Sequence, residues 1–135
     1  KLASKSIADV IDKIENGEAK FEEQKHNQAT YAKKISKLEG KIDWKENAEK
    51  VIAKINGLNP NPGAWFMFNK ERYKVWQAEV ININSEPGKI IDNDLTIACN
   101  SKAVKILEIQ KEGKNKQLVK DFLLGNKMKS GEMVS

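Results

Sequence analysis

A change of hydrophobic period at one proline-rich segment constrains the fold of this chain more than any other feature. Before the segment NGLNPNPGAW, at residues 56–65, apolar residues recur at helical spacing, and after it they alternate. Pro60 and Pro62 each fix their own φ and disfavour helical conformations at Asn59 and Asn61. Because the neighbouring glycines permit tight reversals, we expect a rigid corner that converts the end of a helix into the first strand of a sheet.

Two amphipathic helices are predicted before this corner. The first spans roughly residues 6–16, and its apolar stripe consists of Ile7, Val10, Ile11 and Ile14. The second follows Asp43, a predicted N-cap with Glu46 three residues later, and ends at Gly57. A single helix of this length is marginal in water, so we expect the stripe of the first helix to pack on a neighbouring surface.

The region after the corner is typical of short antiparallel strands. Four segments rich in β-branched and aromatic residues lie at 64–69, 72–83, 95–100 and 103–110, with a further short segment, GKII, at 88–91. The stretch 114–126 predicts a closing helix that ends at Gly125. The fold class is therefore mainly β with flanking helices (α+β), built around a small sheet or OB-like barrel.

The charge of the chain favours an anionic partner. Lysine and arginine number 24 against 19 acidic residues, and Arg72 is the single arginine. The excess lies in two blocks: residues 33–54 hold seven lysines and four acids, and residues 101–135 hold eight lysines and four acids. Flexible lysine charges suit phosphate contacts more than base reading. The alternative that these lysines only keep the domain soluble remains open at this point.

Catalytic motifs are missing from the sequence. His26 is the only histidine, and no triad, P-loop, dinucleotide fingerprint or metal-ligand spacing surrounds it. Cys99, the single cysteine, excludes an internal disulfide framework and fits a reducing compartment. No apolar run reaches membrane-spanning length, so we expect no membrane partner. We expect the chain to catalyse nothing on its own.

Five short segments occur in the same order and at similar intervals as in the C-terminal portion of the methionyl-tRNA formyltransferase family. They are YAKKISKLEGKIDW, INGLNPNPGAW, YKVWQAEVI, PGKII and ILEIQKEGK. The opening KLASKSIADVIDKIENG also resembles the last helix of that family's catalytic domain, and FEEQKHNQATYA resembles the linker that leaves it. The resemblance covers essentially all of residues 1–126.

This resemblance implies both a fold and a function. Full-length members transfer a formyl group from 10-formyltetrahydrofolate to methionyl initiator tRNA, at a Rossmann-like N-terminal domain that carries the catalytic residues and the folate pocket. The resemblance implies a terminal helix of the catalytic domain at 1–17, a linker at 18–30 and an OB-like Greek-key barrel at 31–126. From the sequence beyond it, we expect a flexible tail at 127–135. No catalytic residue, metal or cofactor is assigned to this chain.

The expected partner is initiator methionyl-tRNA, bound in the cytoplasm by charge and shape. We predict that six lysines contact its phosphates: Lys33, Lys34, Lys37, Lys41, Lys114 and Lys116. Where the family has a basic residue, this chain has Asn56, to which no contact is assigned, and Asn61 stands where the family has tryptophan. The full-length enzyme is expected to be a monomer, whereas this chain is expected to self-associate through its first helix.

Three alternatives remain open from the sequence alone. One is the C-terminal domain of a related formyltransferase, since such barrels are similar. Another is a free-standing OB-type module for single-stranded nucleic acid, which requires exposed aromatic residues on one face. The candidate stacking residues are Trp65, Phe66, Phe68, Tyr73 and Trp76. The third is a purely structural or interaction domain.

Overall fold

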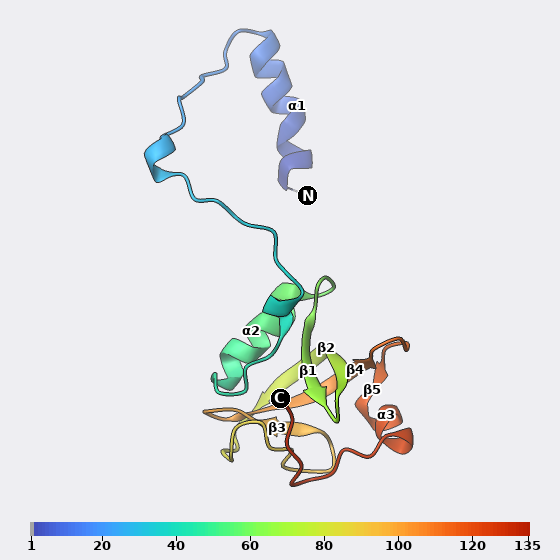
Figure 1. Cartoon of the computed structure of the whole chain (residues 1–135). Helices are drawn as coiled ribbons and strands as arrows, with labels where there is room; N and C mark the ends of the chain where they lie inside the picture. Colours follow the sequence, from blue (N-terminus) through green and yellow to red (C-terminus); the bar gives the residue numbers. More distant parts are fainter. Residues whose placement is uncertain (1) are drawn as a thin grey trace. The chain divides into compact units, whose positions relative to one another are not determined.

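The computed structural model describes residues 2–135, which divide into two compact units on either side of Lys33 and Lys34 (Figure 1). The first unit contains helix α1 (Leu2–Glu15) and the short 3-10 helix η1 (His26–Gln28). No residue between 3 and 33 is buried. The helix predicted at residues 6–16 is therefore present, with its apolar stripe exposed.

The second unit is built on an antiparallel sheet of five strands. These are β1 (Ala64–Phe68), β2 (Glu71–Ile81), β3 (Thr96–Ala98), β4 (Ala103–Lys111) and β5 (Gln117–Leu118). Their order is β1-β2-β4-β3, and β5 pairs with β4. Each strand begins close to the position that the alternating pattern predicts, except β5, which precedes the closing helix.

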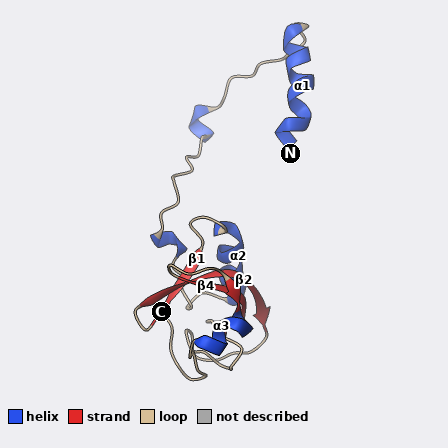
Figure 2. Ribbon diagram, turned by 90° about the vertical axis from the view of Figure 1, so that its right-hand side faces the viewer, coloured by secondary structure: helices blue, strands red, loops and turns tan. Residues whose placement is uncertain are grey.

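Helices lie on either side of the strands in both views (Figures 1 and 2). Helix α2 (Ala48–Leu58) follows the 3-10 helix η2 (Leu38–Gly40), and α3 (Val119–Gly125) follows β5. The N-cap of α2 is Asn47, whose side chain accepts a hydrogen bond from the Lys50 backbone N–H, and not Asp43 as predicted. Asp43 instead accepts from the Lys45 N–H, which fixes a turn before the helix.

The core of the second unit is one cluster in which buried residues of the sheet pack with buried residues of α2 and α3. Phe66 is fully buried and packs against two aromatic rings. Its ring centre lies 5.8 Å from that of Trp44, which it meets edge-on, and 5.7 Å from that of Tyr73, on which it stacks. Tyr73 in turn meets Phe122 of α3 edge-on at 5.7 Å. These aromatic pairs join β1, β2 and α3 in one cluster.

The mainly β, α+β class is confirmed, whereas closure into a barrel is not. The hydrogen-bonded path of strands is open, with β1 and β3 at its ends. Isolated bridges join Ile90 to Ile97 of β3 and Lys89 to Met133. The sequence therefore predicts the strands, and beyond β3 the open sheet is extended by single-residue bridges.

The C-terminal segment, for which the sequence predicts a flexible tail at 127–135, packs against the domain. Met128 and Val134 are only 5% and 6% exposed. The backbone of Ser135 exchanges two hydrogen bonds with Met67, of 2.6 and 2.9 Å. The physical reason is that an edge strand offers unpaired backbone groups, and that two apolar side chains fix the segment beside it.

Candidate functional site

One solvent-facing side of the sheet, which we call the outer face, carries a cluster of aromatic and cationic side chains. Strand alternation creates it, because Tyr73 and Val75 of β2 point into the core and their neighbours point outward. The outer face consists of Trp65, Arg72, Lys74, Trp76, Gln110 and Glu112, most of them half-buried.

The register of the strands sets this cluster in rows. Trp65 of β1 pairs with Lys74 of β2, and Lys74 pairs with Gln110 of β4. The Arg72 guanidinium forms an ion pair with Glu112 and lies 5.4 Å from the centre of the Trp65 ring. Neighbouring side chains on one face of a sheet are close enough to interact, and on this face Arg72 and Lys74 each lie over a tryptophan ring.

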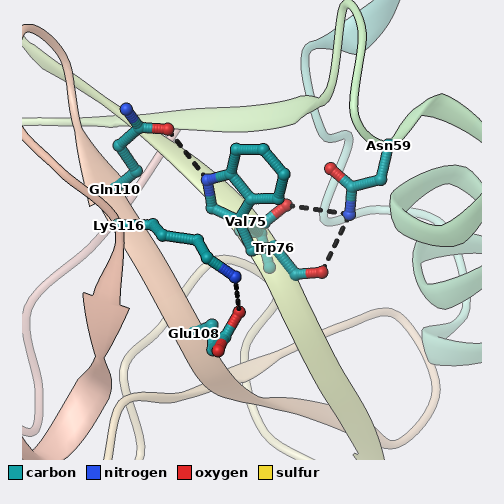
Figure 3. A network of polar contacts seen from close by, with 6 residues as sticks. All are labelled: Asn59, Val75, Trp76, Glu108, Gln110 and Lys116. Atoms are coloured by element: carbon teal, nitrogen blue, oxygen red, sulfur yellow. Dashed lines mark hydrogen bonds and ion pairs between the residues drawn. The ribbon is translucent and has the colours of Figure 1, made fainter.

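Trp76 is fixed by hydrogen bonds at both ends (Figure 3). Its indole Nε1 donates to Gln110 Oε1 at 2.8 Å, and its backbone carbonyl accepts from Asn59 Nδ2 at 2.8 Å. A register irregularity between Val75 and Gln77 lies at this residue, and such bulges re-aim a side chain. The amide of Asn59 thus ties the corner before β1 to the strand that carries Trp76.

Lys74 is enclosed by the corner. Its Nζ lies 4.2 Å from the centre of the Trp76 ring and donates to the Pro60 carbonyl at 2.5 Å. Burial lowers the pKa of this ammonium below its usual range. Gly63, at φ +81°, leaves room for the lysine stem, since a Cβ there would overlap Lys74 Cε.

A hollow of about 250 Å³ opens on the outer face between the corner and the turn after β4. The charged side chains that line it are Lys37, Arg72, Lys74 and Glu112, three cations and one carboxylate. The hollow is therefore electropositive, and an anion is the ligand that this charge favours.

Three of the six predicted lysines lie at the outer face. The carbonyl of Lys37 accepts a hydrogen bond from Trp65 Nε1 at 2.9 Å, and that of Lys114 accepts from Gln110 Nε2 at 2.7 Å. Lys116 Nζ lies 5.4 Å from the Trp76 ring centre and forms a 3.0 Å ion pair with Glu108 (Figure 3).

The other three predicted lysines lie elsewhere. The backbone carbonyl of Lys41 accepts a hydrogen bond from Lys54 Nζ at 2.9 Å. Lys41 also lines a second hollow, beside Trp44. Lys34 begins the second unit and is exposed, and Lys33 ends the first unit. The structure thus gathers half of the predicted set around the two tryptophans.

Sequence reasoning missed Arg72 and Lys74 as site residues. The signal was present in the stretch RYKVW, where period-two alternation puts Arg72, Lys74 and Trp76 on the face opposite Tyr73 and Val75. The lysine blocks pointed to residues outside β2, whereas Lys74 lies within this strand and contacts the Pro60 carbonyl and the Trp76 ring.

The residues considered for catalysis show no reactive arrangement. His26 lies in an exposed 3-10 turn of the first unit. Cys99 is fully buried, and burial raises the pKa of its thiol to about 12. Within residues 2–135, no group of histidine, cysteine and acidic side chains is arranged to hold a metal ion. The same described residues contain no helix that is long and apolar enough to span a membrane.

Fold and site together define a small α+β domain whose sheet carries a cation-rich outer face. Residues 34–127 match the family model described as the formyl transferase, C-terminal domain. The chain belongs to this family. The strands, the corner and the outer face all lie within the matched residues.

Individual relatives agree with this assignment. The chain is 46% identical over 135 residues to the methionyl-tRNA formyltransferase of Pelagibacter ubique (strain HTCC1062), covering 99% of this chain and 44% of the relative. It is 42% identical over 104 residues to the enzyme of the same name from Rickettsia typhi (strain ATCC VR-144 / Wilmington), covering 76% of this chain and 34% of the relative. The chain thus spans less than half the length of these relatives.

A solved structure shares the fold. The crystal structure of HypX from Aquifex aeolicus in complex with tetrahydrofolic acid superposes with a TM-score of 0.68 at 16% sequence identity. The match covers 93% of this chain and 24% of that one. At this identity the likeness concerns the fold alone.

Proposed function

We propose that this chain is the tRNA-binding part of a methionyl-tRNA formyltransferase. The whole enzyme would transfer a formyl group from 10-formyltetrahydrofolate to methionyl initiator tRNA in the cytoplasm, at the start of translation. The observation that carries the proposal is the 46% identity to such an enzyme along the whole chain. The cation-rich outer face supplies the physical means of binding.

Recognition in this proposal is by charge and shape. Lysine ammonium groups contact phosphates without reading bases, and structured RNA is bound largely through its backbone and its shape. The phosphate contacts are assigned to Lys33, Lys34, Lys37, Lys41, Lys114 and Lys116.

Formyl transfer itself is assigned to a part of the enzyme other than residues 2–135. The single histidine, His26, lies in an exposed turn, and the one thiol, Cys99, is buried and protonated at neutral pH. Neither is placed to act on an aminoacyl group or a folate. We therefore derive no catalytic step from these residues, and their role is to hold the tRNA.

Salt-dependent binding of tRNA by the 135-residue chain tests this function. We expect the logarithm of the binding constant to fall linearly with the logarithm of the salt concentration, because each phosphate contact releases counterions. Fluorescence anisotropy of labelled initiator tRNA measures this directly. Absence of salt-dependent binding would remove the proposed function.

A single-strand-binding role is the second candidate, and the position of Trp65 and Trp76 on one face favours it. Stacking on bases needs free ring faces, but Arg72, Lys74 and Lys116 lie over these two rings. We therefore expect folded tRNA to displace an oligo-pyrimidine from the chain. The reverse preference would select the single-strand module.

The exposed stripe of α1 bears on association. Ile7, Val10, Ile11 and Ile14 are 46% to 56% exposed, and we infer that in the whole, monomeric enzyme they pack on the catalytic domain. Alone, the chain is expected to cover them by self-association. Sedimentation velocity should show dimers that an Ile11→Glu variant loses, whereas a monomeric parent chain with α1 ordered would contradict this inference.

A further inference from the structure

Lys74 differs from three other lysines of the second unit in the groups that contact its ammonium. Lys105, Lys111 and Lys116 each form an ion pair with a carboxylate, at 3.0, 2.7 and 3.0 Å. Among residues 2–135, no carboxylate lies within ion-pair distance of Lys74, which contacts the Pro60 carbonyl and an indole ring instead. Its charge is thus held in place without being cancelled.

The backbone around Lys74 is shaped to receive it. Gly63 has a positive φ of 81° and approaches so closely that any side chain there would displace the lysine. The Pro60 carbonyl comes from the same corner, which Asn59 ties to β2 through its bond to the Trp76 carbonyl. Corner and strand together therefore fix one ammonium group beside the hollow.

The two tryptophans serve as supports for cations in this arrangement. Both indole N–H groups are engaged, Trp65 Nε1 with the Lys37 carbonyl and Trp76 Nε1 with Gln110 Oε1. Lys74 lies 4.2 Å from the centre of the Trp76 ring. A base that stacked on the face of the Trp76 ring covered by Lys74 would displace a partly desolvated cation. A neutral base would not replace the interactions that the ammonium loses.

The charge balance of the hollow favours an anion with several oxygen acceptors. Lys37, Arg72 and Lys74 line it, and Glu112 is the one carboxylate among its lining residues. A cation that is partly withdrawn from water gains more from an incoming anion than a solvated surface lysine does, because the local dielectric constant is lower. Phosphate offers both the charge and the acceptors.

We propose that this hollow binds one backbone phosphate of the RNA, with Lys74 as its fixed cation and with Trp65 and Trp76 as the scaffold that positions the surrounding cations. The inference rests on the proposed tRNA-binding function and adds to it a defined phosphate subsite. Lys37 and Arg72, which also line the hollow, supply the remaining donors.

Matched lysine variants of the 135-residue chain test the subsite. Lys74→Met keeps the apolar stem that fills the space beside Gly63 and removes the charge. Lys105→Met is the control, since Lys105 also lies in a strand but is paired with Asp94. Both variants lower the net charge by the same amount.

We expect Lys74→Met to reduce the salt slope of tRNA binding by roughly 0.7 to 0.9, the loss of one phosphate contact. Lys105→Met should leave the slope close to that of the parent chain. Thermal unfolding of both variants checks that each is folded. A parent-like slope for folded Lys74→Met, with tRNA still bound, would overturn the subsite and leave the proposed function intact.

An experiment on the unaltered chain gives a second reading. In ¹H–¹⁵N spectra, the indole N–H resonances of Trp65 and Trp76 should shift on addition of tRNA, whereas that of the core residue Trp44 should not. Inorganic phosphate at matched ionic strength tests whether a free anion suffices, and weaker shifts at the same two resonances are expected. If tRNA binds and the indole N–H resonances of Trp65 and Trp76 do not shift, the subsite is contradicted. Absence of any tRNA binding would overturn both proposals.

Discussion

Helices α1 and α2 have similar amphipathic sequences but very different surroundings. In α1 the apolar residues Ile11 and Ile14 are 48% and 49% exposed, whereas in α2 Val51 and Ile55 are 3% and 0% exposed. Both stripes follow the helical period. The difference lies in what covers them, because α2 packs on β1, β2 and β4, while the unit of α1 contains no sheet among the residues that the structure describes.

This contrast shows what an amphipathic pattern specifies. The period of apolar residues predicts the helix and the face that needs a partner, but the partner comes from elsewhere in the fold. For α2 the alternating strands of the same unit supply it. Under the proposed function, the partner of α1 is the catalytic domain of the whole enzyme, or a second copy when the chain is alone.

The two units should differ most in how much stability is lost when an apolar side chain is truncated. Phe66→Ala removes a fully buried ring that contacts Trp44 and Tyr73, and we expect the free energy of unfolding to fall by about 3–5 kcal/mol. Urea denaturation followed by tryptophan fluorescence measures this, since all three tryptophans lie in the second unit.

The matched change in the first unit is Ile11→Ala. Because Ile11 is about half exposed, the same unfolding transition should move by less than about 0.5 kcal/mol when measured on monomeric chain. A large shift from Ile11→Ala would contradict this prediction and show that the stability of the second unit depends on α1.

The next largest effect is expected at Gly63. An alanine there must adopt a left-handed backbone and displace the Lys74 stem, so Gly63→Ala should cost about 1–3 kcal/mol. Gly57→Ala is the control, because Gly57 lies inside α2 and an alanine Cβ there would meet no other atom within 4 Å. That variant should stabilise the domain by up to about 1 kcal/mol. Equal effects of the two changes would show that neither the positive φ nor the Lys74 stem restricts the residue at position 63.

Much of the second unit could be predicted from its sequence. Alternation located β1 to β4, the apolar period located α2 and α3, and Pro60 and Pro62 marked the corner, where Asn59 is extended at φ −74° and ψ 141°. The packing of residues 127–135 could not be predicted, because Met128 and Val134 stand in a polar stretch with no period. Their burial depends on a free strand edge that only the assembled sheet provides.

The candidate site was predicted less completely than the fold. Clustered charge pointed to the lysine blocks, of which Lys37, Lys114 and Lys116 lie beside the outer face; their phosphate contacts stay predictions. The enclosure of Lys74 depends on the register of β1 with β2 and on the approach of Gly63. Both are long-range features, which local sequence patterns do not encode.

The two tyrosines allow a pH-dependent comparison of the units. Tyr31 is 92% exposed and Tyr73 is 3% exposed, and burial, followed by the hydrogen bond to Glu71, raises the pKa of Tyr73 to about 12 from its usual 10.0. The protonated phenol therefore contributes stability that is complete below pH 10 and is lost as the pH rises through 12. The loss should be on the order of 2 kcal/mol.

Difference measurements isolate this contribution. In a Tyr31→Phe variant, the phenolate absorbance should report the ionisation of Tyr73 alone, at a pH above that of a free tyrosine. Above roughly pH 9, the free energy of unfolding of this variant should fall more steeply with pH than that of a Tyr73→Phe variant. If both chains show the same pH dependence, the phenol is not protected as the structure indicates.

The smallest expected effect compares single lysines on either side of the unit boundary. Lys33 ends the first unit and Lys37 lies in the second, and both are assigned phosphate contacts, so Lys33→Gln and Lys37→Gln should each lower the salt slope of tRNA binding by roughly 0.7 to 0.9. Lys50→Gln is the control, because Lys50 is already paired with Glu46 at 2.9 Å.

If only Lys37→Gln lowers the salt slope, the interface is confined to the second unit, since a lysine of the first unit would then bind no phosphate. Equal losses at both positions would mean that the segment leading out of α1, although it buries no residue, takes part in holding the RNA.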